Sequence, residues 1–371
     1  MFARSRPRPR QSATRIVAER IGVKEALRSA TQFFRLENAV FFATAPHTAR
    51  AFPRILTYAF LMRCVLGFDG GGTKTDCVLM DEHGLVRARS QAGPSNPSRI
   101  GFGAAFAAVR DSAQQAMNDA HLAKRDVAAI CAGLAGTGQS GDAQKMRALL
   151  ATEFAGIPLQ ICTDLDLALA AVRNGPAIVL VAGTGSAAIG RNEAGQVARV
   201  GGHGPMVSDE GSAYDIGRRA VTTALKEFDR TGVDSSLGLR ILMEMGSSKW
   251  PEIRKRIQAA PDEVFPRLFS VTAAMADNGD SAAQGILRSA AYALAALATS
   301  LAERLQITEE RFLLVKTGGM IGKCKYFDAQ LNERLRVTLP HAQPGAMEMP
   351  PAEVGAHLAL ESLRAAGKAR K

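Results

Sequence analysis

The chain has 371 residues, of which 47% are hydrophobic, and this length favours two domains rather than one. No apolar run approaches the ~20 residues that a membrane span needs, so we expect no membrane contact. The net charge of +11 is uneven, because residues 1–62 hold 11 of the 46 Lys and Arg but only 3 of the 35 Asp and Glu. The remainder is nearly balanced, so the high net charge says little about nucleic acid, and we expect no nucleic-acid partner.

Five cysteines are scattered along the chain without a Cys-x-x-Cys pair: Cys64, Cys77, Cys131, Cys162 and Cys324. Such spacing argues against a zinc or disulfide scaffold and for a reducing compartment, so we expect a cytoplasmic protein. The same spacing offers no evident pair of ligands for an iron–sulfur cluster.

Residues 1–62 differ in composition from everything that follows. Arginines alternate with prolines and serine near the start, and residues 13–36 have a helical composition. Three interpretations stay open: a targeting peptide, a small DNA-binding unit in which residues 18–26 resemble a helix-turn-helix, or a disordered or non-native extension. We favour the third, because Met62 stands just ahead of the first expected strand.

A glycine-rich turn between two short apolar runs follows. The runs are residues 65–68 and 77–80, and Asp69-Gly-Gly-Gly-Thr-Lys-Thr75 lies between them, which predicts a β-hairpin. The glycines let a ligand approach the backbone N–H groups, and two hydroxyls and an ammonium add donors suited to phosphate. Asp69, at the strand end, is placed to hold a hydrated Mg²⁺. An ordinary glycine-rich hairpin is the alternative.

The chain continues in the alternating pattern of the α/β class. We expect strands at residues 85–90, 127–132 and 159–162, and helices at residues 101–120, 142–154 and 164–172. A second glycine-rich loop, residues 133–138, follows the strand at 127–132.

The plan of strand, glycine turn and strand then occurs a second time. An apolar strand at residues 177–182 leads into Gly183-Thr-Gly-Ser186 and a return strand. Two copies of one nucleotide-binding plan indicate duplicated domains that face each other across a cleft. The later expected elements are a strand at 196–200, a helix at 213–228, mostly helices at 232–305 including 282–305, a strand at 312–316 and a helix at 353–366.

Four motifs occur in order: Asp69 to Thr75, Gly183 to Ser186, Ser208-Asp-Glu-Gly-Ser212 and Gly318-Gly-Met320. Together they resemble the BadF/BadG/BcrA/BcrD ATPase family, and within it the N-acetylglucosamine kinase branch, over roughly residues 64–366. The resemblance implies two ribonuclease-H-like, actin-like ATPase domains of the α/β class with a nucleotide cleft between them. We place these domains at residues 63–155 plus 355–367 and at 156–354, with 1–62 as the extension.

The resemblance implies an ATP-dependent kinase that phosphorylates an amino sugar of the N-acetylglucosamine or glucosamine type at the 6-hydroxyl, with ATP and Mg²⁺ as cofactors. We also expect a homodimer, with the sugar as its small-molecule partner. The implied ATP-binding residues are Gly70, Gly71, Gly72, Thr73, Lys74 and Thr75, then Gly183, Thr184, Gly185 and Ser186, and finally Gly318 and Gly319 beside the adenosine.

Three further residues, Asn96, Gly202 and Asp209, match positions that line the sugar site in the related kinases. An amide and a carboxylate suit sugar hydroxyls, because between them they donate and accept hydrogen bonds in defined directions. Each also has a structural alternative. Asn96 precedes Pro97 and could form an Asx turn, and Asp209 or Ser212 could cap the following helix.

The general base is where this chain departs from the related kinases. In the animal sugar kinases the loop after the 127–132 strand carries an aspartate at a place that matches Gly138 here. Asp142, four residues later, is one candidate for the catalytic base, although it could equally be a helix N-cap. Asp164 is the other candidate, and the resemblance favours a metal-binding role for it.

Two functions from other classes stay as alternatives. One is the activator ATPase of an acyl-CoA dehydratase or reductase, which holds an iron–sulfur cluster by cysteines at a dimer interface; the scattered cysteines argue against it. The other is a sugar-sensing regulator with an N-terminal DNA-binding unit, for which the basic N-terminus is the only support.

Overall fold

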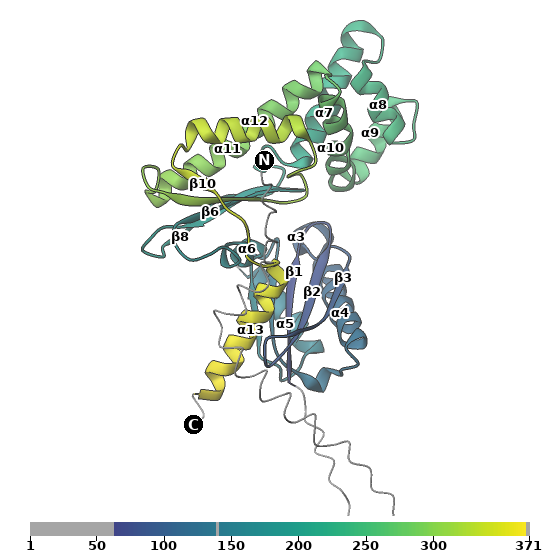
Figure 1. The fold of residues 1–371 in the computed structure, drawn as a ribbon. Coiled ribbons are helices and arrows are strands. Elements are labelled where there is room, and N and C mark those ends of the chain that lie inside the picture. The colour runs from purple at the N-terminus through teal and green to yellow at the C-terminus, as the bar shows by residue number, and fades with distance from the viewer. Residues whose placement is uncertain (1–62, 139–140, 369–371) are drawn as a thin grey trace, which may run out of the picture. The chain divides into compact units, whose positions relative to one another are not determined.

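The computed structural model describes residues 63–138 and 141–368. The interpretations of residues 1–62, and of Met62 as a start, therefore lie outside the described residues. Two five-stranded sheets organise the described part of the chain, and each contains one of the two predicted glycine turns (Figure 1).

The first sheet contains β1 (Cys64–Gly70), β2 (Thr75–Asp81), β3 (Val86–Ala92), β4 (Val127–Leu134) and β5 (Leu159–Cys162). Its order is β3-β2-β1-β4-β5, with β1, β2 and β3 as an antiparallel meander and β4 and β5 parallel to β1. Gly70 pairs with Thr75, so the first glycine turn stands at the carboxyl end of β1.

The second sheet contains β6 (Ala177–Ala182), β7 (Ser186–Arg191), β8 (Val197–Gly201), β9 (Phe312–Thr317) and β10 (Ala342–Pro344). Its order is β10-β9-β6-β7-β8, with β6, β7 and β8 as a meander and β9 and β10 added in parallel. Each strand has a counterpart of the same direction in the first sheet. The duplication predicted from the two glycine turns is therefore confirmed in the strand order.

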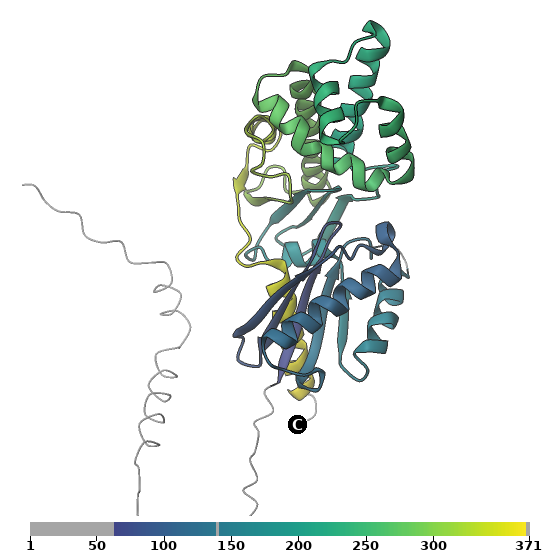
Figure 2. The same cartoon turned by 90° about the vertical axis from the view of Figure 1, so that its right-hand side faces the viewer.

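Helices cover both faces of the first sheet, which explains why β1 is a continuous apolar run. The alternation of side chains along β1 sends Leu66 and Phe68 toward α4 (Phe102–Asp119) and Val65 toward α13 (Pro351–Lys368). Figure 2 shows α4 on one face of this sheet and α13 on the other. A Cβ on Gly67 would clash with the backbone of Ala356, so the close approach of α13 requires glycine at this point of β1.

The remaining elements of the first half are short or lie at the sheet edge. They are α3 (Pro97–Ile100), a 3₁₀ turn at Lys124–Asp126, α5 (Asp142–Glu153) and α6 (Asp164–Ala170). α5 packs against β5, whereas α6 contacts both β4 and β6 and so touches both sheets.

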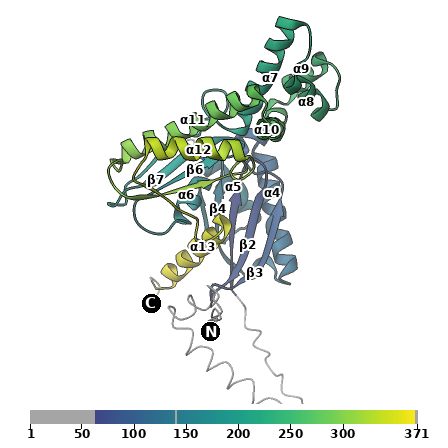
Figure 3. The same cartoon turned by 45° about the horizontal axis from the view of Figure 1, so that its top comes forward.

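Six helices accompany the second sheet: α7 (Ala213–Thr231), α8 (Ser236–Glu244), α9 (Trp250–Ala259), α10 (Pro261–Asp277), α11 (Ser281–Leu305) and α12 (Lys325–Thr338). α11 and α12 lie side by side over the sheet (Figure 3). Within the described residues, only α11 is long and apolar enough by composition to cross a membrane, although its unbroken apolar run, residues 290–298, is much shorter than the ~20 residues of a span. Half of its most apolar window is buried, and its alanines and leucines pack in the core of the second half.

Most expected elements are observed within about three residues of their predicted ends. Two differences bear on the site. α3 forms directly after Asn96, ahead of the helix that the sequence analysis expected from residue 101. β5 pairs with β4, so the first sheet extends past residue 155, at which the sequence analysis ended the first domain. The division into domains stays a prediction.

Candidate active site

A cavity of about 1270 Å³ lies where the two glycine turns meet. Of the residues singled out from the sequence, those in its wall are Asp69, Gly71, Gly72, Thr73, Lys74, Asn96, Asp164, Gly183, Thr184, Gly185, Ser186, Gly202, Asp209, Gly318 and Gly319. Gly70, Thr75 and Asp142 are not among the described residues of the wall. The fold thus gathers all but three of the predicted site residues around one space.

The glycines of the first turn serve different purposes. A Cβ on Gly70 would clash with Ser95 and would lie 2.6 Å from Leu134 Cδ2, so the packing of the protein itself requires this glycine. A Cβ on Gly71 would meet nothing closer than Lys74 O at 3.8 Å. The space over Gly71 is therefore open to a ligand, whereas Gly70 shapes the turn from beneath.

The polar side chains of this turn are divided in the same way. The Thr75 hydroxyl is buried, 2.7 Å from Gly93 O and 2.8 Å from Ser95 Oγ. This corrects the assignment of Thr75 as a phosphate donor, because its hydroxyl ties the turn to the following loop. Thr73 and Lys74 stay at the cavity wall, and Lys74 Nζ lies 2.7 Å from the Asp76 carboxylate.

The second turn contacts the first turn directly. Thr184 Oγ1 lies 3.2 Å from Thr73 Oγ1. On its other side, the atom nearest to a Cβ placed on Gly183 would be the backbone nitrogen of Gly319, 3.8 Å away. The three segments that the resemblance assigns to ATP are therefore neighbours along one wall of the cavity.

Asp69 and Asp164 bring two partly buried carboxylates into the cavity. Burial raises the pKa of Asp69 to about 7; the charges of Asp164 and Asp76 add to the rise, and Lys74 opposes it. Burial likewise raises the pKa of Asp164 to about 6, opposed by the Leu165 N–H and by Arg199. Both carboxylates are thus destabilised in their charged form without a counter-ion.

This carboxylate pair fits a divalent cation. Asp164 is free to face the cavity because Thr163, which accepts the N–H of Asp166 at 3.2 Å, supplies the cap of α6. Within residues 63–138 and 141–368, no three His, Cys, Asp or Glu side chains gather into a complete metal site. The pair therefore suits Mg²⁺, which keeps waters and takes further oxygens from bound phosphates.

Asn96 combines both roles considered for it. Its Oδ1 accepts the N–H of Ser98 at 3.0 Å and so caps α3, which is the expected Asx geometry. The same amide lines the cavity and lies against Gly136, where a Cβ would clash with it. The cap holds the amide in one orientation, which suits recognition of a polar ligand.

Asp209 is 7% exposed and has a backbone φ of +66°. Ser212, not Asp209, is the N-cap of α7, since its hydroxyl accepts the N–H of Asp215 at 3.2 Å. Burial raises the pKa of Asp209, while the N–H groups of Ser186 and Gly204 and the charge of Arg99 lower it; the net shift is upward. Asp209 is therefore a basic, desolvated carboxylate that capping does not occupy.

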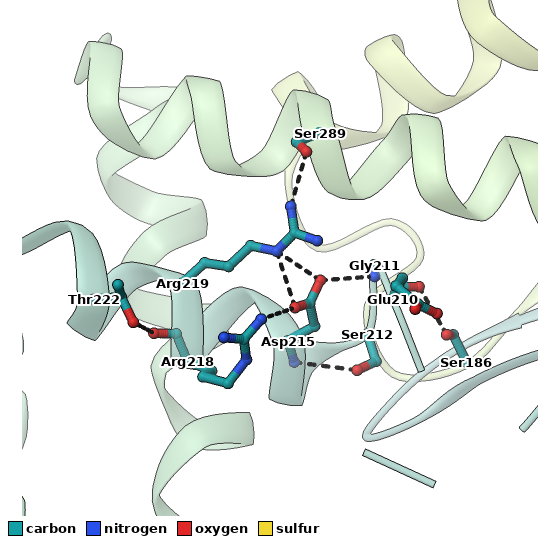
Figure 4. Close-up of polar contacts among 9 residues, drawn as sticks. All are labelled: Ser186, Glu210, Gly211, Ser212, Asp215, Arg218, Arg219, Thr222 and Ser289. Carbon is teal, nitrogen blue, oxygen red and sulfur yellow. Dashed lines mark hydrogen bonds and ion pairs between the residues drawn. The ribbon is translucent and has the colours of Figure 1, made fainter. Parts of the chain in front are cut away.

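The loop that carries Asp209 is joined to the second turn and to α7 (Figure 4). The Ser186 hydroxyl donates to Glu210 O at 2.8 Å, and the Gly211 N–H donates to Asp215 Oδ2 at 3.0 Å. Asp215 is in turn bound by two arginines of its own helix, Arg218 and Arg219. The loop is thus fixed on both sides of Asp209.

Asp142 lies outside the cavity wall that the described residues form. It is the first residue of α5, after the N-cap Gly141, and its carboxylate lies 3.5 Å from Lys145 Nζ. A general base must reach the reacting hydroxyl directly or through one water. The structure therefore does not give Asp142 the geometry of a base, and it is not the N-cap either.

The sequence analysis missed two arginines of the cavity wall. Arg99 lies 3.0 Å from Asp262 of α10 and so joins the first half to the second. Arg199 donates to Gly202 O at 2.9 Å, and a Cβ on Gly138 would lie 2.8 Å from Arg199 Nη1. Arg199 thus borders the place at which the animal sugar kinases are expected to carry an aspartate. Neither arginine belongs to a local motif; only their position three residues from Asn96 and Gly202 could have marked them.

The repeated sheets and the two glycine turns around one cavity define the class: the protein has the two-domain fold of the actin-like ATPases. The family model of the BadF/BadG/BcrA/BcrD ATPases matches residues 66–345, and the chain belongs to this family. The resemblance stated from four short motifs is therefore confirmed.

Individual relatives extend this comparison. The chain is 30% identical over 315 residues to an N-acetyl-D-glucosamine kinase of Dictyostelium discoideum, covering 80% of this chain and 98% of that protein. It is 27% identical over 282 residues to an N-acetylmuramic acid/N-acetylglucosamine kinase of Clostridium acetobutylicum, covering 75% and 92%. A crystal structure of a candidate N-acetylglucosamine kinase from Chromobacterium violaceum superimposes with a TM-score of 0.66 at 25% identity, covering 81% and 99%.

Proposed function

We propose that this protein is an ATP-dependent kinase that phosphorylates an amino sugar of the N-acetylglucosamine or glucosamine type. One observation carries the proposal: two glycine turns suited to phosphates share a cavity with the Asn96 amide and the Asp209 carboxylate, which suit sugar hydroxyls. The curated relatives are N-acetylglucosamine kinases or accept that sugar by name, which supports the same substrate class.

At the nucleotide end, the two turns would hold the phosphates of ATP. The Gly71 N–H closes its own turn on Lys74 O at 2.9 Å, so the turn is already shaped before a ligand binds. Its remaining N–H groups, with the Thr73 hydroxyl and the Lys74 ammonium, would donate to phosphate oxygens. Gly318 and Gly319, at the end of β9, would lie beside the adenosine.

Asp69 and Asp164 would hold Mg²⁺ between the first turn and α6. The ion would neutralise charge on the phosphates during phosphoryl transfer. The protein contributes the two carboxylates at fixed places, one at the end of β1 and one at the start of α6.

At the sugar end, Asn96, Gly202 and Asp209 would bind the hydroxyl and amide groups of the substrate. Gly202 has a φ of +70°, and a Cβ there would clash with Arg199, so the backbone itself is presented to the ligand. We propose the 6-hydroxyl as the acceptor, in line with the resemblance to the N-acetylglucosamine kinase branch.

Contacts between the two halves would keep water from the transferred phosphoryl group. The ion pair of Arg99 with Asp262 and the contact of Thr73 with Thr184 lie at the cavity wall. Their closure around both substrates would limit ATP hydrolysis in the absence of sugar.

We further propose a cytoplasmic homodimer whose other partners are small molecules. The activator ATPase is the alternative from another class. Cys131 and Cys162 are neighbours on β4 and β5 although distant in sequence. Cys131 is fully buried in the first half, whereas the cluster of an activator is held where two subunits meet. This arrangement favours the kinase over the activator.

A coupled assay of ADP release tests the proposal with purified full-length protein. We expect ADP release with Mg²⁺ and N-acetylglucosamine or glucosamine, a sugar phosphate as product, and no turnover of the 6-deoxy sugar. Turnover of the 6-deoxy analogue would refute the 6-hydroxyl assignment. ADP release that no sugar in a panel of amino sugars stimulates would refute the kinase.

A further inference from the structure

The backbone at Asp209 is held in a conformation that aspartate rarely adopts. Among the described residues, three that are not glycine have a positive φ, and Asp209 is the one in the cavity wall. The left-handed region costs an ordinary residue of the order of 1 kcal/mol and is tolerated best by Asn and Asp. Such conformations persist where the surroundings hold them, and they concentrate at functional sites.

The two oxygens of this carboxylate have different surroundings. Oδ2 faces the second turn, since a Cβ on Gly185 would lie 2.8 Å from it. Oδ1 is buried and is the one buried side-chain N or O atom without a hydrogen-bond partner in the described part of the chain. A buried acceptor without a donor is costly, so this oxygen is suited to a donor that arrives with a ligand.

The backbone of the loop that carries Asp209 and the second turn form one hydrogen-bonded unit. The N–H of Ala213 donates to Gly183 O at 2.9 Å, and the N–H of Ser212 donates to Asp209 O at 3.1 Å. These bonds hold the backbone of Asp209 at a fixed place relative to a phosphate bound at the turn, with its carboxylate packed against Gly185. A group that accepts a proton during phosphoryl transfer needs this fixed relation to the phosphate.

We propose that Asp209 is the general base of the reaction, with Oδ1 accepting the proton of the sugar hydroxyl; this inference rests on the proposed kinase function. The hydroxyl oxygen forms a bond to the γ-phosphorus. The bond from that phosphorus to the bridging β,γ-oxygen breaks, and its electron pair leaves with ADP. The hydroxyl proton moves to Oδ1 and passes to water when the products leave.

The other carboxylates are less suited to this role. Asp142 lies outside the cavity wall of the described residues. Asp69 and Asp164 are assigned to Mg²⁺, and the charge of Asp164 helps to raise the pKa of Asp69. Asp209 is the remaining predicted carboxylate in the wall, and the upward shift of its pKa makes it a stronger base than an exposed aspartate.

The variant Asp209→Asn tests the base with little risk to the fold, because asparagine tolerates a positive φ as well as aspartate does. We expect kcat to fall by roughly 10²–10⁴-fold. The sugar affinity, measured by calorimetry, should fall far less, because the amide oxygen of asparagine can still accept a hydrogen bond, and the ATP affinity should stay unchanged. The matched control is Glu210→Gln, which removes the exposed carboxylate next to it and should leave kcat unchanged.

The outcomes are distinguishable. A wild-type protein without sugar-dependent ADP release overturns the kinase and the base together. An active wild type with a near-normal kcat and weaker sugar binding in Asp209→Asn overturns the base alone, since Asp209 would then only bind the sugar. Equal losses of kcat in Asp209→Asn and Glu210→Gln would also overturn it, because a disturbed loop would account for both.

Discussion

The turn of the first half, residues 71–74, and the turn of the second half, residues 183–185, connect corresponding strands of their sheets. The first turn is supported by the loop that carries Ser95. The Ser95 side chain fills the space beside Gly70, and the Ser95 N–H donates to Gly71 O at 3.1 Å. The second turn is supported by the loop that carries Asp209, whose carboxylate fills the space beside Gly185.

Each turn therefore has one glycine that the protein requires and one that is open to a ligand: Gly70 and Gly71 in the first, Gly185 and Gly183 in the second. The duplicated backbone is alike, and the side chain packed beneath each turn is what differs. The same arrangement of strands can therefore form two turns that donate hydrogen bonds to phosphate, while only the second turn has a carboxylate, that of Asp209, packed beneath it. The following changes test that division, from the largest expected effect to the smallest.

Among these changes, Asp164→Asn should have the largest effect, because it removes one of the two carboxylates assigned to Mg²⁺. We expect kcat to fall by roughly 10²–10³-fold and the Mg²⁺ concentration for half-maximal rate to rise. A titration of the rate with Mg²⁺ measures both. An unchanged Mg²⁺ dependence would contradict the assignment of the metal to the first half and α6.

Gly185→Ala should displace the Asp209 carboxylate, since its new Cβ would lie 2.8 Å from Oδ2. A misplacement of about 1 Å typically costs roughly 10²-fold in rate, so we expect a loss of that size in kcat. Gly183→Ala is the matched control, because its new Cβ would lie no closer than 3.8 Å to another atom, the Gly319 backbone nitrogen. This variant should weaken ATP binding and leave the Asp209 carboxylate in place. If both variants lost only ATP affinity, the position of the Asp209 carboxylate beside Gly185 would have no effect on kcat, which would contradict this prediction.

Gly71→Val should weaken ATP binding by about tenfold or more, by blocking hydrogen bonds to a charged phosphate. The fold should survive, since the side chain enters open space, and the melting temperature should stay within a few degrees. Gly70→Ala should show the reverse pattern, a lower melting temperature from overpacking against Ser95 and Leu134. The ATP affinity and the melting temperature are measured for both variants. A normal ATP affinity in Gly71→Val would contradict the assignment of the first turn to the nucleotide site.

The β2–β3 and β7–β8 hairpins, which follow the two turns, are closed by side chains that differ in charge, an aspartate in the first and an asparagine in the second. Asp81 closes the β2–β3 hairpin, its carboxylate accepting the N–H groups of His83 at 3.0 Å and Leu85 at 2.9 Å. Asn192 closes the β7–β8 hairpin at the corresponding place, its amide oxygen accepting the N–H of Gln196 at 3.0 Å. Burial raises the pKa of Asp81, but these N–H groups and Arg87 outweigh burial and hold the pKa below its usual value.

The smallest effect is expected in the stability of these hairpins. Asp81→Ala and Asn192→Ala should each lower the free energy of unfolding by about 1–2 kcal/mol at neutral pH. A carboxyl whose folded-state pKa is lowered stabilises the protein above the unfolded-state pKa, and this stabilisation is lost as the pH falls through the folded-state pKa. The loss in Asp81→Ala should therefore shrink below about pH 4, while that in Asn192→Ala should not. Urea unfolding at several pH values measures the free energy of unfolding of the wild type and both variants. Losses that depend on pH in the same way in the two variants would contradict the prediction.

Much of the local structure followed from short-range patterns. The two glycine turns, the flanking strands and the order of the later helices were predicted because side-chain alternation and glycine positions act on the nearest backbone. The same patterns marked Asp69, which stands at the end of an expected strand, whereas Asn96 and Asp209 were marked only by the resemblance to the related sugar kinases. The local patterns did not separate Thr73 from Thr75, although the Thr73 hydroxyl contacts Thr184 in the second turn and the Thr75 hydroxyl donates to Gly93 O.

The sequence by itself thus determined that two glycine turns exist and which polar residues accompany them. Only the tertiary structure decided which of those residues share a space, because the deciding contacts join residues far apart in the chain: Thr73 with Thr184, Arg99 with Asp262. Asp142 and Asp209 look alike as carboxylates near the start of a helix. The packing of α7 and the second turn places Asp209 in the cavity wall, whereas α5 begins outside it.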